Sequence, residues 1–141
     1  MTAPLYVLDT DIVTFQQVGR ASVLQRLAGL TPDTVFTTVV TMREQLRGRL
    51  TTVDQATKVD ELVYAYDRLL TTVRYFARVN VLPFTTAAAT ILQDLQRQRI
   101  RIGTQDLRIA AIVLAAQGTL VTANSRDFTK VPGLQIEDWT R

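Results

Sequence analysis

The feature that most constrains this chain is a short apolar run, Tyr6-Val7-Leu8, which leads directly into a carboxylate at Asp9. Three consecutive apolar residues are typical of a strand that is buried on both faces, as in a parallel sheet. In open α/β sheets, ligands bind at the carboxyl ends of the strands. The pattern therefore predicts that Asp9 lies at the sheet edge where a binding or catalytic site would form.

Strand-like and helix-like segments alternate along the rest of the chain. Further strands are predicted at 35–40, 79–82, 119–122 and 134–136, and amphipathic stretches between them predict helices. This alternation is typical of βαβ units. It predicts an α/β fold with one domain over residues 1–141, in which helices cover both faces of a mainly parallel sheet of four to five strands.

Polar residues in front of apolar helical stripes predict where the helices begin. The expected N-caps are Ser22, Thr41, Asp54 and Thr104. Gly48 is expected to end the helix that Thr41 begins, so that Glu44 lies in its first turn. The apolar residues from 59 to 76 keep helical spacing, and the whole stripe, Tyr66 included, is expected to be core.

His and Cys are both absent from the 141 residues. Their absence excludes a Ser-His-Asp triad, a thiolate nucleophile and the usual structural zinc sites. Carboxylates, hydroxyls, Lys, Arg and any bound metal remain for chemistry. The net charge is +3 and the basic residues are nearly all Arg, which favours bidentate contacts to phosphate.

Neither a membrane segment nor a secretion signal is expected. No apolar run approaches the roughly 18 residues of a transmembrane helix, and the first residues lack the basic and apolar regions of a signal peptide. We therefore expect a cytoplasmic protein without a membrane partner.

Four carboxylates occupy equivalent positions in the predicted fold. Asp9 ends the first strand and Glu44 follows the second. Asp106 opens a helix that is apolar on most sides, and Asp127 follows the fourth strand. At least three of them are expected to converge at one sheet edge, where charges about 4 Å apart repel by about 4 kcal/mol at an effective dielectric near 20. No lysine is expected beside them, and their oxygen ligands suit Mg²⁺ or Mn²⁺.

Each carboxylate also has a purely structural interpretation. Asp106 and Glu44 could do no more than stabilise helix dipoles, each by about 0.3–1 kcal/mol. Asp11 could simply cap a helix, and Asp127 could be a solvated loop residue. Asp9 is harder to explain in this way, because a carboxylate that closes an apolar strand needs a local partner or a ligand.

Four segments resemble the acidic motifs of PIN-domain nucleases. They are Leu8–Ile12, Thr41–Gly48, Ile102–Ala111 and Leu120–Phe128. The ending, Val131-Pro132-Gly133-Leu134 followed by Glu137-Asp138-Trp139, is similar to that of VapC toxins. The resemblance covers essentially the whole chain in the same order and spacing.

This resemblance implies a small doubly wound sheet and an endoribonuclease that depends on Mg²⁺ or Mn²⁺. Such an enzyme cleaves RNA, often structured RNA such as tRNA, by metal-activated water. The resemblance also implies the toxin of a type II toxin–antitoxin pair, a homodimer that a cognate VapB-type antitoxin holds inactive.

The same motifs suggest roles for individual residues. Asp9 and Asp106 match the central metal ligands, and Glu44 completes the acidic trio. Asp127 or Asn124 fills the fourth position and orients the water or a second ion.

Other residues of these motifs are expected to support them. Thr10 and Ser125 are expected to donate hydrogen bonds to phosphate. Asp11 stands where the family pattern has Asn, which adds a negative charge beside Asp9.

Two other functions fit parts of the sequence. The run Asp9-Thr10-Asp11-Ile12-Val13 fits the opening motif of haloacid-dehalogenase-like phosphatases, in which Asp9 would be a covalent nucleophile. Lys58 and Lys130 are poorly placed for that class. The other alternative is a non-catalytic PIN-like domain that binds RNA or protein, although crowded carboxylates do not help a protein to bind a polyanion.

Overall fold

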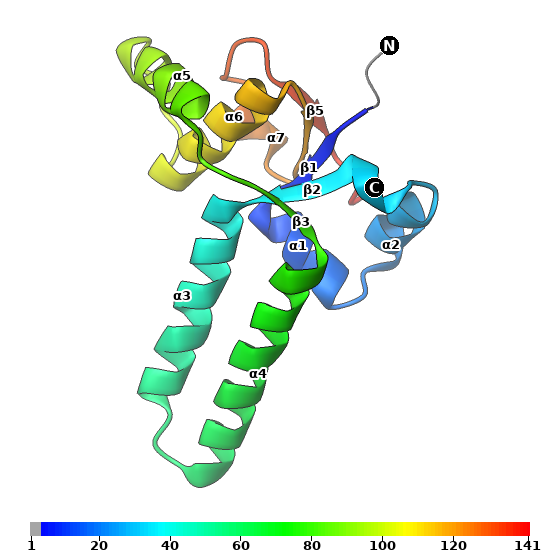
Figure 1. Ribbon diagram of the computed structural model, residues 1–141, viewed down its shortest axis with the longest axis vertical. Helices are drawn as coiled ribbons and strands as arrows, with labels where there is room; N and C mark the ends of the chain where they lie inside the picture. The colour runs from blue at the N-terminus through cyan, green and yellow to red at the C-terminus, as the bar shows by residue number, and fades with distance from the viewer. Residues whose placement is uncertain (1–3) are drawn as a thin grey trace.

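The computed structural model describes residues 4–141, which are built around a five-stranded, fully parallel sheet (Figure 1). The strands are β1 (Tyr6–Leu8), β2 (Val35–Thr38), β3 (Asn80–Leu82), β4 (Thr119–Val121) and β5 (Gln135–Glu137). Their order is β3-β2-β1-β4-β5, with β1 in the centre. The predicted parallel α/β sheet is confirmed, including the edge strand near the C-terminus.

Seven α-helices and one short 3₁₀ turn connect the strands. They are α1 (Thr10–Gln17), α2 (Ala21–Ala28), the turn η1 (Pro32–Thr34), α3 (Val39–Gln55), α4 (Val59–Arg78), α5 (Thr86–Arg97), α6 (Thr104–Ala116) and α7 (Ser125–Phe128). No helix within residues 4–141 is both long and apolar enough to cross a membrane.

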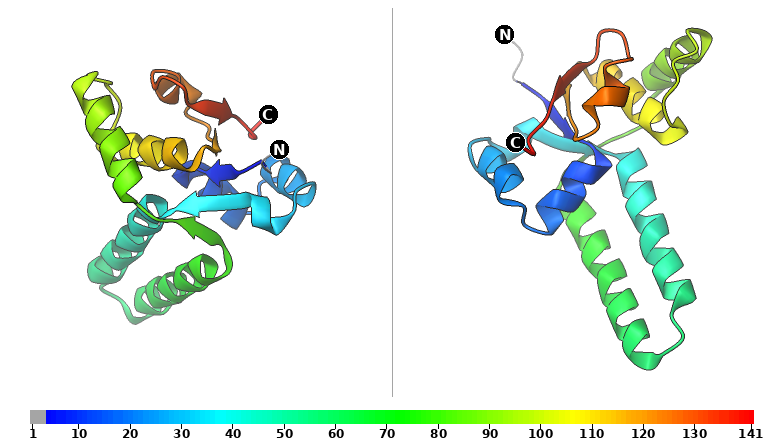
Figure 2. Two further views of the ribbon diagram at one scale, coloured as in Figure 1. Left: turned by 45° about the horizontal axis from the view of Figure 1, so that its top comes forward. Right: turned by 180° about the vertical axis from the view of Figure 1, so that it is seen from behind.

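Alternate residues of the central strands pack into two separate cores. Val7 and Leu120 contribute to the core that contains α5, α6 and α7. Leu8 and Val121 contribute to the other core, with α1, α2 and the buried Trp139. Helices therefore cover both faces of the sheet, as the continuous apolar strands require (Figure 2).

Helices α3 and α4 form a hairpin that projects from the sheet (Figures 1 and 2). The predicted start of α3 is wrong: Thr38, not Thr41, is its N-cap, and its Oγ1 accepts a hydrogen bond from the Thr41 amide at 3.1 Å. Glu44 consequently lies in the second turn. The predicted end at Gly48 is also wrong, because packing along α4 outweighs the low helix propensity of one glycine, which is about 1 kcal/mol.

Three other predicted caps are also wrong. Asp54 lies inside α3, and Lys58 precedes α4. Ser22 lies inside α2, which follows Arg20. Gly103 is the N-cap of α6, so Thr104 is the first helical residue, because the backbone is still extended at Gly103.

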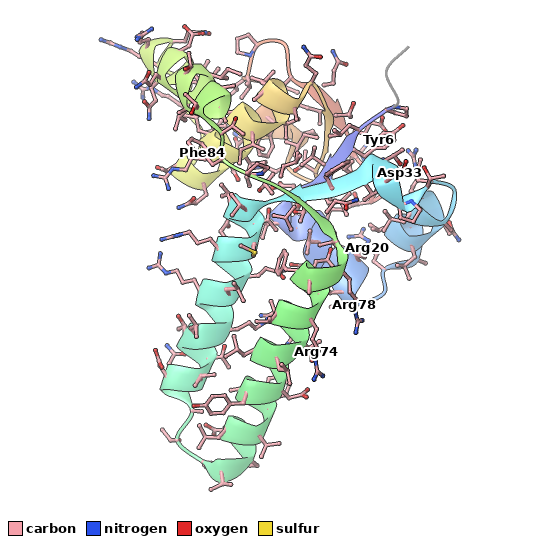
Figure 3. The ribbon with its side chains drawn as sticks, viewed as in Figure 1. Tyr6, Arg20, Asp33, Arg74, Arg78 and Phe84 are labelled. Atoms are coloured by element: carbon pink, nitrogen blue, oxygen red, sulfur yellow. The ribbon has the colours of Figure 1, made fainter. Side chains whose placement is uncertain are left out.

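The prediction that the whole apolar stripe of α4 is core is wrong for one of its two faces. Phe76 is buried, whereas Tyr66 is 57% exposed. The reason is that α3 covers only one side of the projecting α4, as the side chains in Figure 3 show. The outer face carries Val59, Val63, Tyr66, Leu70 and Val73.

Candidate active site

Asp9 lies where the strand order reverses. From β1 the chain proceeds outward through β2 and β3, and then returns to the other side of β1 with β4. In open α/β sheets such a switch point opens a crevice beyond the carboxyl ends of the strands. Leu8 pairs with Val121 in the register of β1 and β4, so Asp9 and Thr122 emerge side by side at this crevice.

The Asp9 carboxylate is buried, with 5% of the residue exposed, and both of its oxygens have partners. Oδ1 accepts a hydrogen bond from the Thr10 amide at 2.8 Å, where Asp9 is the N-cap of α1. Oδ2 accepts one from the Thr122 hydroxyl, also at 2.8 Å. These contacts hold the carboxylate at the sheet edge.

The environment of Asp9 strongly disfavours its charged form. Burial, followed by repulsion from Asp11, raises the pKa of the Asp9 carboxyl to about 7. Repulsion from Asp106 adds to this, while the hydrogen bonds from Thr122 and Thr10 oppose it. Without a nearby cation, Asp9 therefore holds a proton up to near neutral pH.

A chain of hydroxyl groups links Glu44 to the end of β2. Thr10 Oγ1 donates to Glu44 Oε1 at 3.3 Å and lies 3.0 Å from Thr41 Oγ1. The Thr41 hydroxyl in turn accepts a hydrogen bond from Thr38 Oγ1 at 3.4 Å. The chain orients Glu44 towards the start of α1, and burial raises the pKa of the Glu44 carboxyl.

Asp106, in the first turn of α6, is the common electrostatic neighbour of the other acids. It raises the pKa values of Asp9 and Glu44 by repulsion. Its own pKa is raised by burial, and then by Asp127 and Asp11. The structure therefore brings the predicted trio to one edge of the sheet, within electrostatic range of one another.

Asp11 connects α1 to the segment after β4. One of its oxygens accepts a hydrogen bond from the Ile12 amide at 2.8 Å, and the other accepts one from the Ala123 amide at 3.1 Å. Burial raises the pKa of the Asp11 carboxyl. Asp9 rather than Asp11 is the N-cap of α1.

The fourth position contains both Asn124 and Asp127, which are hydrogen-bonded to each other. Asn124 Nδ2 donates to Asp127 Oδ2 at 3.1 Å, and this bond is the main reason that the pKa of Asp127 is lowered. Asp127 lies in α7, not in a loop, and Lys130 Nζ lies 3.5 Å from its Oδ1. The expectation that no lysine accompanies these acids is therefore wrong here, because the helical turn brings Lys130 back.

The side-chain atoms of this site are suitable ligands for a hard divalent cation. The carboxylate ligand atoms are all oxygens, and within residues 4–141 Asp9, Glu44 and Asp106 form no ion pair with Lys or Arg. No three carboxylates in this part of the chain already surround one point at ligand distances. Their mutual repulsion nevertheless acts, because charges interact over longer distances than metal–oxygen bonds.

The sequence pattern does not reveal the role of Thr122, whose hydroxyl holds Asp9. It predicts only a strand over 119–122, because the pairing of β1 with β4 is not visible in the sequence. Thr122 also accepts a hydrogen bond from the Asn124 amide at 2.9 Å, so it links Asp9 to the fourth position. The predicted roles of Thr10 and Ser125 towards phosphate stay predictions; the Thr10 hydroxyl contacts Glu44 and Thr41.

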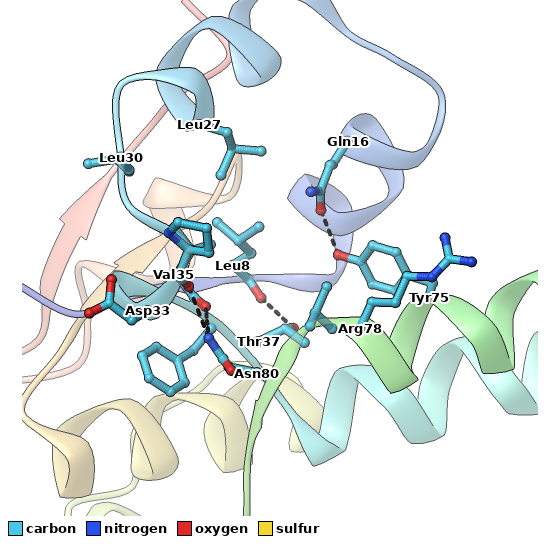
Figure 4. A pocket seen from close by; sticks show the side chains of 13 residues that line it. Leu8, Gln16, Leu27, Leu30, Asp33, Val35, Thr37, Tyr75, Arg78 and Asn80 are labelled. Carbon is cyan, nitrogen blue, oxygen red and sulfur yellow. Dashed lines mark hydrogen bonds between the residues drawn. The ribbon is translucent and has the colours of Figure 1, made fainter.

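An apolar groove lies away from these carboxylates, between α1, α2, β2 and α4 (Figure 4). Its volume is about 420 Å³, and Leu8, Leu27 and Leu30 contribute to its walls. At one side the Tyr75 hydroxyl donates to Gln16 Oε1 at 2.6 Å. Arg78 also lines the groove.

Comparison with known proteins finds similar chains along the full length of this one. The tRNA(fMet)-specific endonuclease VapC of Shigella flexneri is 29% identical over 140 residues, which cover 96% of this chain and 98% of that protein. Ribonuclease VapC1 of Haemophilus influenzae strain R2866 is 27% identical over 139 residues, which cover 97% and 99%. The DNA-bound VapBC structure from Salmonella typhimurium contains a similar chain, with a TM-score of 0.75, 26% identity and coverage of 97% and 99%.

The family model of the PIN domain matches residues 6–134. This match contains all four acidic motifs and confirms the resemblance that they predicted. It also removes the reason for assigning the chain to the phosphatases, since the Asp-x-Asp run lies within the residues that the PIN model matches. The chain belongs to the PIN domain family.

Proposed function

We propose that this protein is a metal-dependent endoribonuclease and the VapC-type toxin of a type II toxin–antitoxin pair, acting in the cytoplasm. The observation that carries the proposal is the position of Asp106, which repels both Asp9 and Glu44 at the switch point of the sheet. A PIN domain with ribonuclease relatives along its full length supports the same activity. Structured RNA such as tRNA is the proposed substrate.

Asp9 and Asp106 would hold Mg²⁺ or Mn²⁺, with Glu44 as the third ligand, directly or through water. Such an ion supplies a Lewis acid that makes water nucleophilic near neutral pH without a histidine. Thr122 and the Thr10 amide keep the Asp9 carboxylate oriented.

Two further contacts tune this arrangement. The hydroxyl chain through Thr10 keeps Glu44 in place. Asp127, bonded to Asn124 and Lys130, stays ionised and would position the attacking water or a second ion.

Replacement of single carboxylates tests the proposal. We expect Asp9→Asn and Asp106→Asn each to reduce Mg²⁺-dependent cleavage of total tRNA by at least about a hundredfold, because each removes a negative ligand. The exposed Asp94 of α5, which accepts a hydrogen bond from Gln98, gives the control variant Asp94→Asn. Undiminished cleavage by Asp9→Asn would refute the assignment of Asp9, whereas absence of Mg²⁺-dependent cleavage by the wild type would favour a non-catalytic PIN domain.

We propose that the cognate VapB-type antitoxin binds the apolar groove beside α2. The groove is largely apolar, and α4 contributes Tyr75 and Arg78 to its lining. Arg74 and Arg78 are one helical turn apart on α4 and point away from α3 (Figure 3), which suits a segment with acidic residues beside its apolar anchor. The family resemblance also implies a homodimer, which sedimentation velocity of the isolated chain tests.

A pair of leucines on α2 tests the groove. Leu27 lines it, whereas Leu24 lies on the same helix, is 41% exposed and does not line it. We expect Leu27→Glu to weaken antitoxin binding at least tenfold, because it places a charge in the groove that would bind an apolar side chain of the antitoxin. Leu24→Glu should have little effect. Equal affinities for the two variants in calorimetric titration would show that the antitoxin binds elsewhere.

A further inference from the structure

A second, shallower pocket lies beside the carboxylates. It has a volume of about 420 Å³ and shares Glu44 with the proposed active site. One wall is the outer surface of α3, and the other is the first turn of α6, next to Asp106. The residues that line it are Arg43, Glu44, Arg47, Gly48, Thr51 and Gln105.

The pocket carries two arginines on the same side of α3. Arg43 and Arg47 are four residues apart, which places them on one face, about 6 Å apart along the helix axis. Both are exposed, and neither forms an ion pair within residues 4–141. Two like charges at this spacing repel each other, and a polyanion would relieve that repulsion. Their spacing along the axis is close to that of successive phosphates in a nucleic acid strand.

The opposite wall carries an unpaired acceptor. Gln105 Oε1 is buried but accepts no hydrogen bond from the described residues. Buried polar atoms are nearly always paired, so this oxygen gains a partner when the Gln105 side chain rotates to present it to a ligand in the pocket that this residue lines. A phosphate has no hydrogen to donate at neutral pH, whereas the ribose 2′-hydroxyl has one beside every phosphate, whatever the base.

We propose that this pocket binds the RNA strand next to the bond that is cleaved. Arg43 and Arg47 contact two successive phosphates, and Gln105 Oε1 accepts a hydrogen bond from the 2′-hydroxyl of the nucleotide between them. Gln105 is thereby a specificity residue that distinguishes RNA from DNA, since only RNA has this hydroxyl. The inference rests on the proposed nuclease function and names the residues that hold its substrate.

Binding measurements without cleavage test the two arginines. We would measure the affinity of the whole protein for a labelled single-stranded RNA by fluorescence anisotropy in EDTA, at several salt concentrations. Each phosphate contact to a single strand contributes about 0.7 to the slope of log affinity against log salt. Arg43→Gln and Arg47→Gln should each reduce the slope by about that amount, and the double variant by about 1.4. Arg97→Gln on α5, outside the pocket, is the matched control and should leave the slope unchanged.

The role of Gln105 is tested with RNA and DNA of the same sequence. Wild type should bind RNA more tightly, and Gln105→Leu should remove this preference by weakening RNA binding alone. Gln105→Glu keeps an acceptor of the same length, so it should retain more of the preference than Gln105→Leu even though its charge weakens both complexes. Equal losses for RNA and DNA in Gln105→Leu would overturn the role of Gln105.

Failure of the pocket and failure of the nuclease proposal give different results. An unchanged salt slope in the double arginine variant overturns the pocket, even if Mg²⁺-dependent cleavage occurs. Absence of cleavage by wild type overturns the nuclease function, while the binding results still decide the pocket.

In the cleavage assay the arginine variants should raise KM and leave kcat nearly unchanged, because the two arginines bind the strand and not the reacting group. Thermal denaturation checks that each variant is folded.

Discussion

At the scale of single residues, Asp9 is a source of instability that a cation would relieve. Its pKa is about 7 in the folded protein, against an ordinary value of 3.8. Between these pH values the folded state holds a proton that the unfolded state has lost. Stability therefore falls as pH rises from about 4 to about 7 and changes no further above that. The loss reaches about 4 kcal/mol at most, at about 1.4 kcal/mol per pH unit.

Asp9→Asn should remove this loss while keeping an oxygen for the Thr10 amide. In EDTA, the free energy of unfolding of the variant minus that of wild type should increase from about pH 4 to about pH 7 and then level off. Urea denaturation across this range measures the difference, with Asp94→Asn as the control. A difference that does not change with pH would mean that Asp9 is ionised throughout.

The sequence predicted which acids lie at one edge of the sheet, but not how they are held. Asp9 and Asp106 were predicted from their positions at a strand end and a helix start. Thr122 could not be assigned to Asp9, because that bond depends on which strand pairs with β1. The contact of Lys130 with Asp127 could not be predicted for a similar reason, since α7 is a single turn without an apolar stripe.

At the scale of elements, α3 shows how packing outweighs local propensity. Gly48 lies in its interior, and a Cβ atom built there meets nothing within 4 Å. Gly48→Ala should therefore stabilise the protein by about 0.4–1 kcal/mol, because alanine loses less backbone entropy on folding. Urea denaturation would measure the gain, and a loss of stability would show that the helix is strained at this position.

The α3–α4 hairpin also marks the limit of what periodicity can predict. The stripe of α4 identified the helix correctly from its spacing. It could not show that its apolar residues divide between a face against α3 and an exposed face with Tyr66 and Leu70. That division depends on the hairpin's projection away from the sheet, which is a property of the tertiary structure.

At the scale of the whole molecule, the proposed metal would join parts of the chain that are far apart in sequence. Its ligands follow β1, lie in α3 and open α6. Mg²⁺ should therefore stabilise the entire domain, by about 2.7 kcal/mol at a concentration one hundred times its Kd. Thermal denaturation with Mg²⁺ and with EDTA measures the effect, which should be absent in Asp106→Asn. An equal rise in Tm for that variant would place the ion elsewhere.

The overall topology was the part that the sequence predicted best. Short apolar strands that alternate with helices leave few arrangements other than a parallel sheet, and the acidic motifs fall at its carboxyl edge. The register of β1 and β4, the length of the hairpin and the contacts of α7 depend on packing between distant segments. No local pattern in the sequence indicates those contacts.

Trp139 is buried against Tyr6, with 5.5 Å between ring centroids, and Thr122, the residue after β4, supplies the hydroxyl that holds Asp9. Residues near both ends of the described chain therefore pack together around the central strand β1. A ribosome must have synthesised nearly the entire domain before Asp9 can be fixed at the sheet edge. If the chain is the proposed nuclease, its carboxylate site would therefore not be assembled until translation is almost finished, which leaves time for the proposed antitoxin to be present first.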